Sequence, residues 1–245
     1  MFKWIKSQIV DTIKLLQAIP SLTLMFFILS VVITNLMAVK FIVNTNLMQV
    51  TGGLLLSWLP FLCMDITAKH FGAVASVKLN LFGLLIYLGC VLLFELVTHI
   101  QICTVTTNID YTAFNLIYSA QWKILVSSSV AYVASGIVNA FVHHLVGAFF
   151  KKNPNGKGAY YTQSYLSTFF GQFSDNFIFV GLLNCFLLGL SWPIMPVLGA
   201  ALLGGTLELL TQMLFSVFGY KMLQRWQRCG VGKEYIESHK AASQN

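Results

Sequence analysis

Six long apolar stretches constrain the fold of this chain more than any other feature of its sequence. A helix that crosses the hydrocarbon core of a bilayer, ~30 Å thick, needs about 20 mostly apolar residues. The stretches that meet this requirement run from about Thr23 to Val43, Gly52 to Phe71, Leu79 to Thr98, Trp122 to Phe150, Ser164 to Leu190, and Trp192 to Tyr220. The sequence therefore predicts an all-α integral membrane protein with six transmembrane helices in a single bundle.

The composition agrees with this class and excludes a soluble enzyme. The chain is 57% hydrophobic and 9% charged, with a mean hydropathy of +0.75. A soluble domain carries about 25% charged residues. The second stretch is the least regular, because Gly52-Gly53 opens it and Pro60 removes an internal hydrogen bond, so we expect its helix to kink or to start late.

The basic residues predict how the chain is oriented. Lys and Arg accumulate in short cytoplasmic loops. Most of the 15 basic residues precede the first stretch, follow the sixth, or lie between stretches two and three and between four and five; Lys40 and Lys123 lie near the opposite ends of stretches one and four. We therefore expect both termini to be cytoplasmic, and the net charge of +7 requires no nucleic-acid partner.

Three regions follow from this pattern. Residues 1–20 are expected to form an amphipathic helix on the anionic cytoplasmic surface of the membrane. One side of this helix carries Trp4, Ile5, Ile9, Ile13 and Leu16, and we expect Lys3, Lys6 and Lys14 to lie largely on the other side. Residues 21–223 form the six-helix transmembrane domain, and residues 224–245 form a basic cytoplasmic tail.

Asp175 lies near the middle of the fifth stretch, where a carboxylate is energetically unfavourable. A charged side chain at the centre of a bilayer costs at least ~2.5 kcal/mol on insertion scales, and such residues mark functional sites. Helical spacing of three and four places Asp175 on one stripe with Tyr165, Thr168, Gln172 and Phe179. We interpret this stripe as facing the inside of the bundle.

Other stretches carry polar residues at comparable depth. Glu208 lies in the sixth stretch and Asn35 in the first, while one side of the fourth carries Ser128, Tyr132, Ser135, Asn139 and His143. Asp65 lies nearer the cytoplasm in the second. These faces predict a polar cavity, with the candidate substrate-binding residues Asn35, Asp65, Tyr132, Asn139, Gln172, Asp175, Phe179 and Glu208. Alternatively, Asn35 and Asn139 only bridge helices, and Asp65 only pairs with Lys69.

No motif predicts a cofactor, a metal or an enzymatic reaction. The five cysteines show neither a CxxC pair nor the spacing of a metal site. HExxH, GxSxG and phosphate-loop patterns do not occur. We therefore expect a protein that is not an enzyme, with no cofactor and no metal.

Two motifs resemble one known family. Asp65-Ile66-Thr67-Ala68-Lys69-His70-Phe71-Gly72 closes the second stretch, and Gly171-Gln172-Phe173-Ser174-Asp175-Asn176-Phe177-Ile178-Phe179 lies in the fifth. Together they are similar to the queuosine precursor transporter family, six-helix membrane proteins of the vitamin-uptake type. Asn35 and Tyr220 also match family positions, whereas Asn176 replaces the usual Thr or Ser and Glu208 stands where some members have a basic residue.

The resemblance implies a function and a location. It implies uptake of 7-cyano- or 7-aminomethyl-7-deazaguanine, or a similar planar nucleobase-like compound, across a bacterial inner membrane. It also implies a fold like the substrate-binding membrane subunits of vitamin transporters. The alternative is that the chain is such a subunit of an ATP-driven vitamin or micronutrient uptake system, with separate ATP-driven partner subunits; the oligomeric state is left open.

The chemistry of the candidate residues suits such a cargo. A guanine-like base presents a ring N–H beside an exocyclic NH₂ group, and one carboxylate, Asp175 or Glu208, can accept both. Gln172 and Asn35 could form hydrogen bonds with the carbonyl group or the ring nitrogens of the base. Aromatic side chains could stack on the base, the candidates being Trp58, Tyr132, Phe173 and Phe179. The same acids could instead carry protons, because burial raises the pKa of a carboxyl group.

Overall fold

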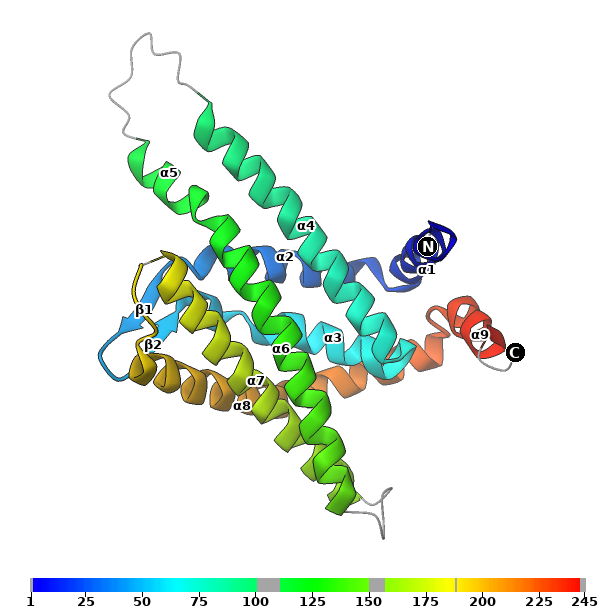
Figure 1. The fold of residues 1–245 in the computed structure, drawn as a ribbon. Helices are drawn as coiled ribbons and strands as arrows, with labels where there is room; N and C mark the ends of the chain where they lie inside the picture. The colour runs from blue at the N-terminus through cyan, green and yellow to red at the C-terminus, as the bar shows by residue number, and fades with distance from the viewer. Residues whose placement is uncertain (1, 101–110, 150–156, 188, 243–245) are drawn as a thin grey trace. The chain divides into compact units, whose positions relative to one another are not determined.

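The computed structural model describes residues 2–100, 111–149, 157–187 and 189–242, which are mostly helical (Figure 1). The helices are α1 (Phe2–Ala18), α2 (Ser21–Met37), α3 (Trp58–Phe71), α4 (Ala73–His99), α5 (Thr112–Ser119), α6 (Gln121–Phe149), α7 (Lys157–Leu187), α8 (Ile194–Cys229) and α9 (Lys233–Ala242). The six predicted stretches correspond to α2, α3, α4, α6, α7 and α8. The loop lysines Lys151 and Lys152 lie outside the described residues.

Three described helical segments are long and apolar enough to cross a membrane by themselves. They are Ala73–His99, Thr112–Phe149 and Ile194–Phe215. A fourth crossing results if α1 and α2, which meet at a bend of 111°, form one broken span. α7 has 31 residues, but the polar run from Gln172 to Asn176 lowers its hydropathy.

The first and second stretches form shorter helices than the sequence predicted. α2 ends at Met37 and α3 starts at Trp58, preceded by a short 3₁₀ helix over Gly52–Leu55. The late start expected from Gly52-Gly53 and Pro60 is therefore confirmed. Helix was predicted as far as Val43, but the chain instead forms β1 (Phe41–Asn44), which pairs with β2 (Gln49–Thr51) in an antiparallel hairpin.

The hairpin has a local cause in its turn residues. The Thr45 backbone N–H donates to the Met48 carbonyl at 2.9 Å, and the Thr45 hydroxyl accepts from the backbone N–H of Met48 at 3.1 Å. Thr and Asn favour such turns because their short polar side chains bond nearby backbone groups. Phe41, Ile42 and Val43 are apolar but also favour a strand. The apolar run in the sequence is therefore longer than the helix that it contains.

The chain divides into two compact units. One contains Met1–Ile33, Leu56–Tyr87 and Gln212–Asn245, and the other contains Thr34–Leu55 and Leu88–Thr211. In the first unit α1 lies against α9, and the rings of Trp58 and Phe215 stack at 4.0 Å. In the second unit α6 and α7 run side by side (Figure 1), and a core of Val180, Val197 and Ala200 packs with Phe177 and Phe179.

Candidate functional site

Asp175 lies on α7 in the second unit and is bonded to α6. The Ser135 hydroxyl lies 3.1 Å from Oδ1 of Asp175 and 3.0 Å from the Tyr132 carbonyl, and its single proton is shared between these two acceptors. No ion pair in the described part of the chain includes Asp175. This carboxylate is therefore held by a neutral hydroxyl group, which leaves acceptor capacity on both of its oxygens.

A glycine brings the two helices together at this point. A Cβ atom added to Gly171 would lie 3.1 Å from Cβ of Asn139 and 3.6 Å from the Ser135 carbonyl. Gly171 and Asp175 are one turn apart on α7, and Ser135 and Asn139 are one turn apart on α6. The small residue therefore lets the face of α7 that carries Asp175 approach the face of α6 that carries Ser135.

Glu208 lies on α8 and contacts a different side of α7. Its side chain is buried, 8% exposed, and its Oε2 accepts a hydrogen bond from Nδ2 of Asn176 at 3.3 Å. The same Asn176 amide donates to the Gln172 carbonyl at 2.9 Å. A Cβ atom at Gly204 would lie 2.6 Å from Cγ of Asn176, so the missing side chain at Gly204 gives the amide room to reach Glu208.

Asn35 completes the polar groups around α6. Its Oδ1 accepts a hydrogen bond from the Ser128 hydroxyl at 2.9 Å. Ser128 and Ser135 are seven residues apart and therefore lie on one face of α6, two turns from each other. This face contacts the Asn35 side chain at one level and the Asp175 carboxylate at another.

The other predicted site residues have varied surroundings. Gln172 and Tyr132 are half-buried, Asn139 is exposed, and Phe179 packs against the core of the second unit. Asp65 is half-buried on α3, which belongs to the first unit. The side chain of His143 lies outside the described part of the structure.

The sequence interpretation missed a second amide pair on α7. Nδ2 of Asn184, which is fully buried, donates to Oε1 of Gln49 at 2.6 Å and to the Val180 carbonyl at 2.9 Å. Its Oδ1 has no hydrogen-bond partner among the described residues. Asn184 lies eight residues after Asn176 on the same helical face, which was the available signal. Its partner Gln49 lies in a strand between the first and second predicted stretches, where the sequence indicated no element.

The polar groups of the second unit therefore form pairs of uncharged donors with carboxylate or amide acceptors. No group of three or more His, Cys, Asp or Glu side chains that could hold a metal ion occurs in the described part of the chain. Such an arrangement can accept hydrogen bonds from a small polar molecule and donate hydrogen bonds to it.

Comparison with known proteins adds one finding. A family model described as "Putative vitamin uptake transporter" matches residues 51–226, which is most of the chain. No curated protein and no solved structure matches the chain.

Proposed function

The chain belongs to this family of vitamin uptake transporters, and on that premise we propose that it carries a queuosine precursor, 7-cyano- or 7-aminomethyl-7-deazaguanine, or a similar planar nucleobase-like compound. The protein is a multi-pass membrane transporter and not an enzyme. Its partners are accordingly a small-molecule substrate and the lipid bilayer. What the proposal adds is the chemical class of the cargo and the residues that bind it.

The observation that carries the proposal is the environment of Asp175. Its carboxylate accepts a hydrogen bond from the Ser135 hydroxyl and forms no ion pair with a described residue. An ionised carboxylate offers about four lone-pair positions, and the hydroxyl group occupies one of them. The remaining positions suit a ligand with two adjacent donors.

The donor edge of a guanine-like base has that geometry. Its ring N–H and exocyclic NH₂ group point the same way, so one carboxylate can accept both in a bidentate, charge-assisted contact. Asp175 takes this role, and Gln172, one turn earlier on α7, faces the same side. Glu208 supports the site from α8 through its hydrogen bond with Asn176.

The pairing of the chain ends supports an even number of membrane crossings. α1 lies against α9, and the Asp11 carboxylate on α1 pairs with His239 on α9 at 3.0 Å. Contact between the two ends supports placing them on the same side of the membrane, which requires an even number of crossings. This agrees with six crossings and with cytoplasmic placement of residues 1–20 and 224–245, on either side of the membrane domain formed by residues 21–223, in a bacterial inner membrane.

Uptake by the purified chain tests the proposal. The protein is reconstituted into liposomes, and entry of labelled 7-cyano-7-deazaguanine, 7-aminomethyl-7-deazaguanine, guanine and a set of vitamins is compared. We expect a deazaguanine to enter fastest and unlabelled deazaguanine to compete with it. Faster uptake of a non-purine vitamin would contradict the assigned cargo.

The same assay decides whether ATP-driven partner subunits are needed. Transport by the chain alone excludes that dependence. Saturable binding of a deazaguanine without transport would keep the assigned cargo and would identify the chain as the substrate-binding subunit of a larger system.

A further inference from the structure

Asp11 fixes the rotation of α1 about its axis within the first unit. Its carboxylate pairs with Lys78 on α4 and with His239 on α9 at 3.0 Å, and it accepts a weak hydrogen bond from the Tyr235 hydroxyl at 3.4 Å. Burial alone would raise the pKa of Asp11, but Lys78 and His239 outweigh this effect and hold it below its usual value. Leu15, one turn further along α1, is fully buried.

With this side packed, the opposite side of α1 is exposed. Ile9, Val10 and Ile13 are 56%, 44% and 49% exposed, and Lys6 and Lys14 lie among them on the same face. The expectation that these two lysines lie on the other side of the helix is therefore wrong. No described residue forms an ion pair with either lysine. Apolar side chains beside unpaired lysines are the pattern of a helix that lies in a membrane interface.

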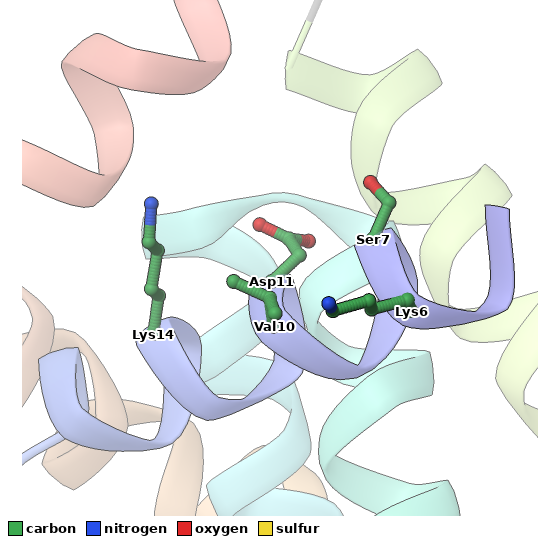
Figure 2. A pocket seen from close by; sticks show the side chains of 5 residues that line it. All are labelled: Lys6, Ser7, Val10, Asp11 and Lys14. Atoms are coloured by element: carbon green, nitrogen blue, oxygen red, sulfur yellow. The ribbon is translucent and has the colours of Figure 1, made fainter. Parts of the chain in front are cut away.

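A pocket next to this face is lined mainly by polar side chains (Figure 2). It has a volume of about 400 Å³ and is lined by Lys6, Ser7, Val10, Asp11 and Lys14, all from α1. The lysines stand on either side of the Asp11 carboxylate, whose charge is already balanced by Lys78. The charge left for a ligand is therefore positive.

The bend between α1 and α2 supports a position at the membrane surface. The two helices meet at a bend of 111°, so where α2 crosses the membrane, as the sequence predicts, α1 runs along the membrane surface instead of through it. Along a membrane surface, the isoleucines reach the acyl chains while the flexible lysine side chains reach the phosphate level.

We propose that this face of α1 binds an anionic phospholipid. Lys6 and Lys14 attract the phosphate diester, Ser7 donates to a headgroup oxygen, and Ile9, Val10 and Ile13 contact the acyl chains. A headgroup with hydroxyl groups, such as that of phosphatidylglycerol, can also donate to the Asp11 carboxylate. A headgroup with an ammonium group would meet the two lysines and is disfavoured.

Lipid retained by the full-length protein tests the proposal. The protein is purified from nanodiscs that contain equal amounts of phosphatidylglycerol, phosphatidylethanolamine and phosphatidylcholine, and its bound lipid is identified by native mass spectrometry. We expect phosphatidylglycerol to be enriched. The double variant Lys6→Gln/Lys14→Gln is expected to bind it about 30-fold more weakly, which corresponds to about 2 kcal/mol for two lysines.

The controls separate a site on α1 from general charge attraction. Lys40→Gln/Lys123→Gln removes the same charge elsewhere and is expected to keep the lipid, as is Lys6→Arg/Lys14→Arg. Inorganic phosphate at millimolar concentration is expected not to displace it. Equal retention by Lys6→Gln/Lys14→Gln and the parent, equal binding of the three lipids, or displacement by phosphate would each overturn the proposal.

Discussion

Replacing Gly204 with alanine tests the packing that holds Glu208 in place. The added Cβ atom would lie 2.6 Å from Cγ, 2.7 Å from Oδ1 and 2.8 Å from Nδ2 of Asn176. These separations are below van der Waals contact, so the Asn176 amide must rotate away from α8. It then loses its hydrogen bond to the Glu208 carboxylate.

The expected cost follows from these changes. A hydrogen bond to a charged group contributes about 1.5–3 kcal/mol, and a residual clash adds strain of about 1–3 kcal/mol in a packed interior. Replacing glycine by alanine in a helix returns about 1 kcal/mol. We therefore expect Gly204→Ala to lower the free energy of unfolding by about 2 kcal/mol or more, measured by denaturation in mixed micelles.

A double-mutant cycle identifies the cause. In the Asn176→Ala background the amide is absent, so Gly204→Ala is expected to be neutral or stabilising, with a coupling energy of about 2 kcal/mol. Gly136 on α6 is the matched control, because an added Cβ atom there meets no atom within 4 Å and alanine should not destabilise. An equal cost of Gly204→Ala in both backgrounds would refute the reasoning.

Two further predictions concern the hairpin and the junction of the chain ends. Gly199→Ala would place a Cβ atom against the Leu47 carbonyl; backbone cannot rotate away, so we expect faster proteolysis of the β1–β2 hairpin, and unchanged cleavage would contradict the contact. Asp11→Asn is expected to lower the melting temperature at neutral pH. The pKa of Asp11 in the folded protein lies below its usual value. Asp11 therefore contributes its full stabilisation of the fold above about pH 3.9, the pKa of Asp in the unfolded chain, and this contribution is lost as the pH falls through the folded pKa. Parent and variant should therefore converge in acid, and a gap that persists there would show that the charge of Asp11 is not the cause.

The sequence predicted helices well and contacts poorly, for physical reasons. Apolar runs identify membrane helices because the bilayer demands length and hydrophobicity, but Phe41, Ile42 and Val43 satisfy both demands and still form a strand. Periodicity placed Asp175 on a face of α7. It could not identify Ser135 as its partner, because that contact depends on how closely α6 approaches at Gly171.

The amide partners were the least predictable part of the site. Asn176 was noted as a departure from a motif, yet it bonds Glu208 across the space opened by Gly204. Asn184 was not singled out, because its partner Gln49 is distant in sequence. Such contacts join residues from separate helices and strands, and single-helix patterns carry no information about them.

Binding of a labelled 7-deazaguanine by Asp175→Asn tests the central claim most directly. The amide keeps the shape of the side chain but replaces one acceptor oxygen with a donor, so the bidentate contact is lost. We expect the affinity to fall by about 10- to 100-fold, as for the loss of a charged hydrogen bond of about 1.5–3 kcal/mol. Glu95→Gln, at a half-exposed acid of α4, should bind like the parent. Equal affinity of Asp175→Asn and the parent would contradict the account.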